Sequence, residues 1–470
     1  SFMNKEILTK LIRIVGKSNA ITNKIDMTKY LTEWRGVYKG KAGVILKPKN
    51  SNEVSKILKV AHDTNTPVIT QGGNTGLVGG QISFDSSHII LSLIRLNKVK
   101  YINSLDRSIT VESGLTLMAL QNFCIQNNTF FPLSLASEGT CTIGGNIATN
   151  AGGVGVLYYG NTRDLVLGLE VVTPSGKIIN NLKTLVKDNT GYSLKDIFVG
   201  SEGTLGVITA ATLKTFPLPK EKYTAILKID SPKKSIKTLR FIQENISTPL
   251  TAFELMNKLS VQFVTKNIPN TLSPFSDFKW IVLIEFSSLE TSDNEIEKIQ
   301  SVLNKLIKLG LIEDGVISSS LSQSKDMWKL RESISESQKI EGGSIKNDIS
   351  VPIKFIDEFI KKGISITKEI IPKSRCVIFG HIGDGNIHFN ISQPTNTKKQ
   401  DFLKYEKKIR KKLVELTMNL DGSFSAEHGV GVTRKAELKK YKKDELNIMR
   451  GIKKSIDSKN ILNPGKIIDY

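Results

Sequence analysis

Hydrophobic positions near the start of the chain alternate between short apolar runs and helical spacing. The run 44–46 predicts a strand. Apolar residues at 54, 57, 58 and 61 then recur at the spacing of one helix face, with Ser51 as the expected N-cap. The run 67–70 predicts another strand, which completes a strand–helix–strand unit. Further elements expected before residue 130 are strands at 89–93 and 109–112 and a helix over 116–126.

From about residue 223 the pattern predicts an α+β domain with the order strand, helix, two strands, helix, strand. These elements are expected at 224–229, 235–244, 252–256, 280–286, from 294 onward, and near 312. Pro217 and Pro219 mark the boundary before this domain, and the chain after about residue 398 is mostly helical. The expected domains are a helical lead-in (1–42), a glycine-rich domain (43–219), the α+β domain (220–397) and a helical C-terminal segment (398–470).

The bulk composition adds one unusual property, a formal net charge of +21 on 470 residues. The basic residues are spread along the chain, are not interleaved with aromatic residues and accompany no recognition motif, so nucleic-acid binding is not expected. A basic surface could instead attract an anionic substrate, an acidic partner or an anionic membrane face. No apolar run approaches the roughly 18 residues that a membrane span needs.

Cysteine usage indicates the compartment. The chain has three cysteines, Cys124, Cys141 and Cys376, without paired spacing. This excludes a disulfide framework and a zinc ribbon, and a reducing, cytoplasmic compartment is expected.

Three segments are rich in glycine and small polar residues: 71–80, 142–153 and 200–208. Glycine lets backbone N–H groups approach an anion closely, as a pyrophosphate requires. The first segment is neither a G-x-G-x-x-G fingerprint nor a Walker loop. Three such segments in one region nevertheless indicate a long, polar ligand bound between two subdomains.

Two short motifs contain three of the five histidines; His62 and His88 are expected to be structural. In the motif 380–390, Asp384-Gly385 predicts a two-residue hairpin turn, which would place His381 opposite His388. Directly opposed residues share a face, with Cβ atoms roughly 4.5–5.5 Å apart, so the two imidazoles could hold one metal ion. Asn390 would lie on the same face.

The second motif, 425–431, offers a carboxylate for such a site. Two imidazoles need a third protein ligand, and an open position if the metal is catalytic. The adjacent Glu427 and His428 can point to different sides, and the neighbouring glycines allow close approach.

A cationic pair could bind an acid. Arg331 and Ser335 are expected one turn apart on one helix face. The alternation of 346–352 predicts a strand with Lys346 and Asp348 on one face. An arginine fork holds a carboxylate by two bonds, and a lysine adds a point charge.

Together these motifs resemble FAD-linked D-2-hydroxyacid dehydrogenases of the vanillyl-alcohol oxidase and p-cresol methylhydroxylase superfamily. The resemblance covers nearly the whole chain and is greatest to the D-2-hydroxyglutarate dehydrogenases, with D-lactate dehydrogenases and glycolate oxidase flavoprotein subunits as relatives. It implies an α+β fold: a p-cresol methylhydroxylase-type FAD-binding domain of two subdomains, a ferredoxin-like substrate domain, and a helical C-terminal segment that packs back on the FAD domain.

The resemblance also implies the cofactor residues. Some relatives attach FAD covalently through a histidine of the first segment; here Asn74 and no histidine is present, so non-covalent FAD is expected. The residues expected to bind FAD are Gln71, Gly72, Gly73, Asn74, Thr75, Gly76, Gly79, Thr142, Gly144, Gly145, Ala148, Thr149, Gly203, Gly206, Val207 and Asn463.

In the same pattern Glu427 is the third metal ligand beside His381 and His388, and His428 is the catalytic base. Arg331, Ser335, Lys346 and Asn390 are the expected substrate-binding residues, with Ser335 where the family commonly has threonine. The ligand types favour zinc. The implied partners are a 2-hydroxy acid, an electron acceptor (a quinone, an electron-transfer flavoprotein or a cytochrome), a second copy in a homodimer, and the inner membrane face as a peripheral contact.

Three alternatives remain open at this stage. The substrate could be D-lactate, D-malate or glycolate instead of D-2-hydroxyglutarate. The flavin fold could instead carry a sugar-nucleotide reductase, which would need a nicotinamide cofactor and would leave the histidine motif unexplained. A non-enzymatic basic protein that binds anionic polymers would be colourless when purified.

Overall fold

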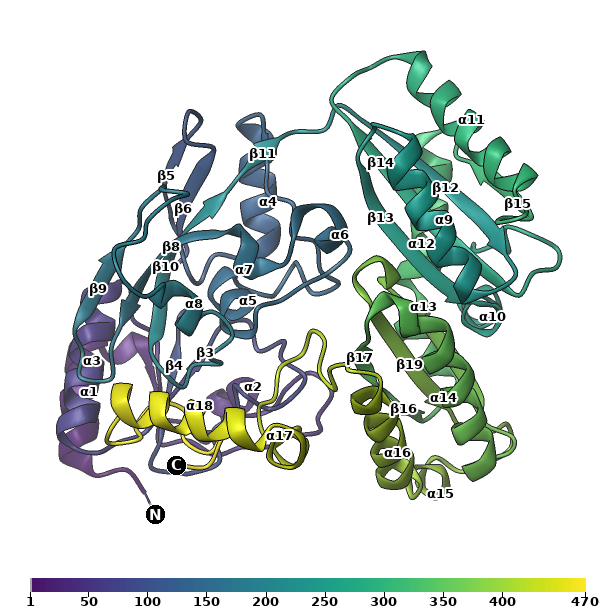
Figure 1. Cartoon of the computed structure of the whole chain (residues 1–470). Coiled ribbons are helices and arrows are strands. Elements are labelled where there is room, and N and C mark those ends of the chain that lie inside the picture. Colours follow the sequence, from purple (N-terminus) through teal and green to yellow (C-terminus); the bar gives the residue numbers. More distant parts are fainter. Residues whose placement is uncertain (1) are drawn as a thin grey trace. The chain divides into compact units, whose positions relative to one another are not determined.

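The computed structural model describes residues 2–470, which form two compact units. The first unit contains the chain up to residue 152, residues 160–217 and residues 427–470. The second contains residues 153–159 and 218–426. In Figure 1 the C-terminal part of the first unit is yellow, far in sequence from the purple and blue parts of the same unit.

The first unit contains a mainly parallel sheet that begins as the sequence predicts. Strands β2 (Val44–Leu46), β4 (Ile89–Ser92) and β3 (Val68–Gln71) are parallel neighbours, and β1 (Ala20–Ile21) pairs antiparallel with β2. Helix α3 (Ser51–Asp63) connects β2 to β3. Its N-cap is Asn50, whose side chain accepts the N–H of Glu53, so the prediction of Ser51 was one residue late.

The second sheet of this unit is antiparallel, with the order β5-β6-β10-β8-β9. The expected helix after β6 is α4 (Leu117–Gln126), capped by the Thr116 hydroxyl. The strands are β5 (Val99–Asn103), β6 (Ser108–Glu112), β8 (Val166–Val172), β9 (Ile178–Asn181) and β10 (Val207–Lys214). The other elements are α1 (Lys5–Val15), η1 (Lys17–Asn19), α2 (Lys24–Leu31), β7 (Thr129–Phe130), α5 (Ile143–Thr149), α7 (Thr162–Leu165), α8 (Leu194–Phe198), β11 (Phe216–Pro217), α17 (Lys435–Tyr441) and α18 (Lys443–Ile456).

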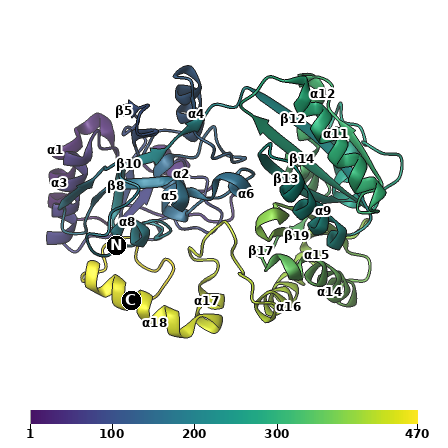
Figure 2. The ribbon, with the colours of Figure 1, turned by 45° about the horizontal axis from the view of Figure 1, so that its top comes forward.

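The second unit contains the predicted strands and helices in the predicted order, with one further helix, α10 (Lys258–Asn267), which the sequence analysis did not predict, between the second and third strands. The elements are β12 (Glu221–Ile229), α9 (Pro232–Asn245), β13 (Leu250–Asn257), β14 (Trp280–Ser288), α11 (Asp293–Lys308) and β15 (Asp314–Ile317). The four strands pair in the spatial order β15-β12-β14-β13, all antiparallel. This is the ferredoxin-like arrangement. Helices α9 and α11 lie side by side (Figure 2).

The same sheet continues beyond β13 through β18, β19 and β16, and β17 also pairs with β19. These strands are β16 (Ser344–Ile345), β17 (Asp348–Ser350), β18 (Arg375–Gly380) and β19 (Asn386–Ser392). The remaining elements are α6 (Val156–Tyr159), α10 (Lys258–Asn267), α12 (Leu321–Glu332), α13 (Ile334–Ile340), η2 (Ile353–Phe355), α14 (Ile356–Ile370), η3 (Ile382–Asp384), α15 (Lys399–Leu403) and α16 (Glu406–Asn419).

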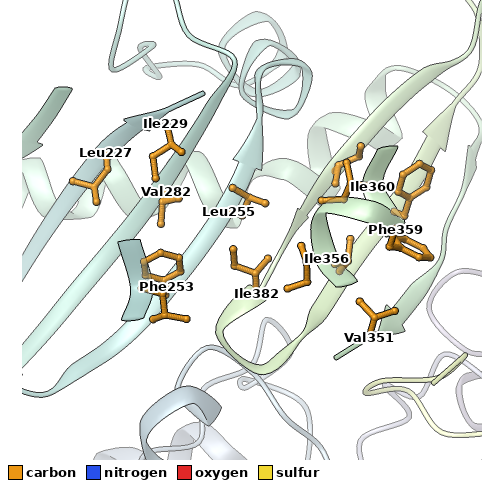
Figure 3. Packing of buried hydrophobic residues seen from close by; sticks show 14 of the residues in the cluster. Leu227, Ile229, Phe253, Leu255, Val282, Val351, Ile356, Phe359, Ile360 and Ile382 are labelled. Carbon is orange, nitrogen blue, oxygen red and sulfur yellow. The ribbon is translucent and has the colours of Figure 1, made fainter. Parts of the chain in front are cut away.

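Successive side chains of a strand point to opposite faces, and in this sheet both faces are buried. Phe253 and Leu255 of β13 belong to the larger core together with Phe359 and Ile360 of α14 (Figure 3). Residues of α9 and α11 belong to the same core. Met256 lies in a second core with residues of α10 and α12. Each such side chain, when fully buried, contributes roughly 1.5–3 kcal/mol. Glu254 therefore lies between two core positions of β13, on the side of α12.

None of the helices in the described residues is long and apolar enough to cross a membrane.

Candidate functional site

The histidine motif does not form the tight hairpin that its sequence predicts. In the ladder between β18 and β19, His388 lies opposite Phe379, so the expected pairing of His381 with His388 was wrong. Residues 382–384 form a turn of 3-10 helix, and Gly385 follows with a left-handed φ of 85°. The glycine is required there, because a Cβ would lie 2.3 Å from the carbonyl oxygen of Val351. The connection is therefore longer than two residues, and His381 lies in it.

The three expected metal ligands nevertheless lie close together. The ligand atoms of His381, His388 and Glu427 are all within 4.8 Å of one another. Glu427 is the residue at which the chain leaves the second unit, and Ala426 just before it donates its N–H to the Asp348 carbonyl of β17 at 3.3 Å. Two imidazoles and one carboxylate form a donor set that divalent zinc uses in catalytic sites. The residues present therefore fit a divalent metal.

A residue that the sequence analysis missed, Glu254, joins two of the predicted positions. One carboxylate oxygen accepts a hydrogen bond from Arg331 Nε at 2.8 Å, and the other lies 2.7 Å from His381 Nδ1. Burial favours a raised pKa, but the charges and hydrogen bonds of His381 and Arg331 outweigh it and hold the pKa of Glu254 below its usual value. The signal in the sequence was a lone carboxylate inside an apolar strand.

Arg331 is fixed on a second side by aromatic packing. Its guanidinium carbon lies 4.8 Å from the ring centroid of Phe379. The Phe379 ring stacks on His388, with centroids 4.9 Å apart and an interplanar angle of 26°. An arginine over an aromatic face gains a cation–π attraction. Arg331 is thus linked to His381 through Glu254 and to His388 through Phe379.

The other expected substrate residues are arranged differently from the prediction. Helix α12 ends at Glu332, and the backbone of Ser333, with ψ of 0°, turns the chain before α13 begins. Arg331 and Ser335 therefore do not share one continuous helix, and Ser335 is exposed. Lys346 is also exposed and lies between β16 and β17, so the continuous strand expected there was wrong.

Asn390 lies opposite this interruption. Its side-chain oxygen accepts the N–H of Asn347 at 3.2 Å, and the side chain of Asn347 donates to the Phe389 carbonyl, beside the backbone bond from the Phe389 N–H to the Asn347 carbonyl at 2.9 Å. The Asn390 amide donates to Gln338 at 3.0 Å. Asn390 is buried and two residues from His388 on β19, so both side chains share one face.

His428, the expected base, is half-buried and follows Glu427 directly. The segment after it is held by Glu202 of the first unit, whose two carboxylate oxygens accept the N–H groups of Val430 (3.1 Å) and Gly431 (2.9 Å). Gly429, between His428 and Val430, has φ of 86°, and a Cβ there would lie 3.0 Å from this carboxylate. Glu202 thus fixes the segment that carries Glu427 and His428.

Glu202 and Lys466 form an unusual electrostatic pair in the first unit. Burial of its carboxylate raises the pKa of Glu202 to about 7. Burial likewise lowers the pKa of Lys466 to about 7. The Lys466 ammonium donates to the carbonyl of Ile82 and to the side chain of Asn463.

Glu202 is expected to make the thermal stability depend on pH. Between pH 4.5 and about 7 the unfolded carboxyl loses its proton while the folded one keeps it, so stability falls as pH rises across this window. Glu202→Gln removes this ionisation, and the midpoint of thermal unfolding should then vary less with pH there. The measurement is a series of melts of wild type and variant. Equal slopes for the two proteins would contradict the assignment.

The three glycine-rich segments meet within the first unit. A Cβ on Gly72 would lie 2.3 Å from the Thr142 hydroxyl, and one on Gly73 would lie 1.9 Å from the Thr140 carbonyl, so the first and second segments touch. Asn463 links the third segment to the first, since its amide donates to the carbonyls of Gly80 and Glu202, each at 2.8 Å.

Several expected FAD residues also shape these segments. Gln71 donates to the carbonyls of Tyr30 and Gln81, and Asn74, with φ of 58°, donates to those of Lys29 and Thr32. Thr142 caps α5 by accepting the N–H of Gly145, and Ala148 accepts the N–H of Glu202. A Cβ on Gly206 would lie 2.5 Å from Val171, so this glycine packs against β8 at the start of β10. The other expected FAD residues, Thr75, Gly76, Gly79, Gly144, Thr149, Gly203 and Val207, belong to the same segments or adjoin them.

Two buried hydroxyls test whether this region fits a cofactor. Thr70 Oγ1 and Ser113 Oγ have no hydrogen-bond partner among residues 2–470, which the structure describes. Thr70 adjoins Gly203 of the third segment, and Ser113 adjoins Gly144 of the second. Because buried polar groups are normally paired, these atoms indicate a polar ligand beside the segments. The residues present therefore fit FAD.

Comparison with known proteins agrees with this arrangement. Residues 42–181 match the model of the FAD binding domain, and residues 218–467 match that of the C-terminal domain of FAD linked oxidases. The D-2-hydroxyglutarate dehydrogenase of Arabidopsis thaliana is 35% identical, over 97% of this chain and 80% of its own length. That of Xanthomonas citri pv. viticola is 34% identical, over 95% of this chain and 94% of its own length.

A solved structure of p-cresol methylhydroxylase with substrate bound has the same fold, with a TM-score of 0.78 at 15% identity, covering 99% of this chain and 97% of that chain. The fold expected from the sequence, with its FAD-binding domain, is thereby confirmed. The chain belongs to the FAD-linked oxidoreductases that act on CH–OH groups, in the family of the D-2-hydroxyglutarate dehydrogenases.

Proposed function

We propose that the chain oxidises a D-2-hydroxy acid, with D-2-hydroxyglutarate as the first candidate, to the 2-oxo acid. The observation that carries the proposal is the cluster of His381, His388 and Glu427, which Glu254 links to a half-buried arginine, Arg331. A metal site beside a fixed cation suits a substrate with a hydroxyl next to a carboxylate. Family membership supports the same class of reaction.

The cluster would hold one divalent ion, with zinc favoured by the ligand types. The bound metal would supply Lewis acidity at the substrate hydroxyl, and bound FAD would accept the hydride at N5. His428 would accept the hydroxyl proton, a role that suits an imidazole at neutral pH. The Nε–H of Arg331 is already bonded to Glu254, so the terminal Nη groups would bind the substrate carboxylate.

Lys346, Ser335 and Asn390 complete the proposed substrate site. The exposed Lys346 and Ser335 would contact the part of the substrate away from the reacting carbon. Asn390 would contact the substrate with its side-chain amide, whose position is fixed by hydrogen bonds to Gln338 and Asn347. The serine hydroxyl can bond as threonine does, but it lacks the methyl group that would narrow the site.

FAD would bind non-covalently to the three glycine-rich segments and Asn463. We further propose that the reduced flavin passes electrons to a quinone, an electron-transfer flavoprotein or a cytochrome. The positive charge would favour an acidic partner or peripheral contact with the inner membrane face. A cytoplasmic location and a homodimer complete this proposal.

A substrate panel on zinc-loaded, FAD-loaded protein tests the proposal. Under anaerobic conditions, D-2-hydroxyglutarate should bleach the flavin absorbance at the lowest concentration, and its L-enantiomer should not. D-Lactate, D-malate and glycolate are the comparison substrates. Faster bleaching by one of these reassigns the substrate within the class.

The same experiment separates the other functions. A colourless protein that binds no FAD would support the non-enzymatic anion-binding protein. Flavin that is bleached by a nicotinamide cofactor and by no hydroxy acid would support the reductase. Either result would contradict the proposed oxidation.

A further inference from the structure

We propose that Glu254 is a positioning residue that couples the metal cluster to the substrate-binding arginine, so that one carboxylate sets the affinity of both sites. The proposal rests on the proposed function for the identity of the two ligands. It goes beyond that function because Glu254, which would contact neither the metal nor the substrate, is assigned a role in linking their binding affinities.

Each oxygen of the Glu254 carboxylate contacts one of the two partner side chains. Oε1 accepts from Arg331 at 2.8 Å, and Oε2 bonds His381 at 2.7 Å. The side chain of Glu254 is 1% exposed, and those of Arg331 and His381 are 13% and 11% exposed. A buried carboxylate must have its charge compensated by partners, and Arg331 and His381 are the two ionisable side chains bonded to it.

The hydrogen bond between Glu254 and His381 determines which ring nitrogen of His381 can bind a metal. Because Nδ1 faces the carboxylate, the proton lies on Nδ1 and Nε2 is the nitrogen that can bind a cation. Such a carboxylate partner fixes the tautomer and the orientation of a metal-binding histidine, and it makes the ligand nitrogen more basic.

The same carboxylate is part of a closed ring of contacts. From Glu254 the ring passes to Arg331, from Arg331 to Phe379 at 4.8 Å, and from Phe379 to His388 at 4.9 Å. The centroids of His388 and His381 are 6.0 Å apart, and His381 returns to Glu254. All five side chains belong to the second unit. Ordering of the histidines by a metal therefore also orders the arginine, and binding of an anion orders the histidines in turn.

Glu254→Gln breaks this link while it nearly keeps the size of the side chain. An amide presents one oxygen and one NH₂ group, so it can accept from only one of the two donors and points hydrogens at the other. Zinc should bind roughly 10- to 100-fold more weakly, the range for loss of a carboxylate that supports a ligand histidine. An anion should also bind several-fold more weakly to the metal-free protein, because Arg331 loses its anchor.

Glu285→Gln is the matched control. Glu285 lies on the neighbouring strand β14 and accepts hydrogen bonds from Trp328 of α12 at 2.6 Å and from Thr224 at 2.9 Å. It therefore holds the same helix as Arg331 without touching Arg331 or either histidine. The affinities of Glu285→Gln for zinc and for the anion should both stay within about threefold of wild type, because no bond that supports a ligand residue is lost.

The experiment uses FAD-loaded protein and two probes that need no turnover. Zinc affinity is measured by competition with a chelator, and glutarate affinity is measured by calorimetry on zinc-stripped protein. Loss of both affinities in Glu254→Gln, with both kept in Glu285→Gln, supports the coupling. Loss of one affinity alone, or equal losses in the two variants, overturns it.

A second variant guards against failure of Glu254→Gln to fold. Glu254→Asp keeps the charge but withdraws the carboxylate, so it cannot span both partners, and both affinities should fall about tenfold. Two unchanged affinities in this variant also overturn the coupling. Wild-type protein that binds neither zinc nor glutarate would overturn the proposed function together with the coupling. Normal wild-type binding with unaffected variants overturns the coupling alone.

Discussion

His428→Ala is expected to abolish most turnover while flavin and metal stay bound. His428 is proposed to accept the hydroxyl proton, and loss of a general base typically lowers kcat by roughly 10²- to 10⁴-fold. The metal should remain because the ligand cluster consists of His381, His388 and Glu427. The measurements are kcat with a dye acceptor, the visible spectrum, and metal content per chain.

His62→Ala is a suitable control for this variant. His62 lies near the end of α3 in the first unit, its side chain is partly exposed, and it lies 3.8 Å from Asp63. This substitution should leave kcat within about twofold of wild type, as expected for a surface position away from any functional group. If His428→Ala retained most of its activity, His428 could not be the base.

His381→Ala should lose metal and activity together. The substitution removes one of three protein ligands and also deprives the buried carboxylate of Glu254 of one of its two partners. Zinc content should fall to near zero, and kcat should fall at least as far as in His428→Ala. FAD should remain, because the glycine-rich segments belong to the first unit.

Metal analysis after exhaustive dialysis, together with the flavin spectrum, distinguishes the two histidine variants. His428→Ala should give a yellow protein with metal, and His381→Ala a yellow protein without metal. A His381→Ala protein that kept a full complement of zinc would remove His381 from the ligand set.

Local chemistry made much of the fold predictable from the sequence. The elements from β12 to β15, apart from α10, followed from apolar spacing, because the buried strands are apolar runs and the helices bury one apolar stripe. The glycine-rich segments were recognisable because close backbone approach leaves few other residues possible. At Gly73, for example, a Cβ would overlap the Thr140 carbonyl oxygen.

The errors arose where tertiary contacts decide local geometry. Asp384-Gly385 is a strong turn signal, but Gly385 serves instead to pass close to the Val351 carbonyl, and this lengthens the connection. Lys346 lies outside the ladder: its carbonyl accepts a hydrogen bond from Arg410 of α16, and the side chains of Asn347 and Asn390 make bonds of their own beside it. No local sequence pattern predicts the close approach of Gly385 to Val351 or the side-chain hydrogen bonds of Asn347 and Asn390.

Glu254 could not be assigned a role from the sequence for a related reason. Its partners, Arg331 and His381, lie 77 and 127 positions along the chain, and only the sheet brings them together. A carboxylate in an apolar strand signals that some cation must be present. Neither spacing nor composition identifies which one.

The first unit is formed by segments that are far apart in the sequence, and this has a consequence for its folding during synthesis. Strand β3 is bridged at Val68 by Leu462, and Lys453 is held by the carbonyls of Thr204 and Leu462. A ribosome adds roughly 5–20 residues per second, so Leu462 emerges on the order of ten to fifty seconds after Pro217. During this interval the nascent unit lacks Asn463, the residue that ties the first glycine-rich segment to the third. If the tie through Asn463 is needed to hold FAD, as we propose, stable loading of the flavin is expected only after the entire second unit has been translated.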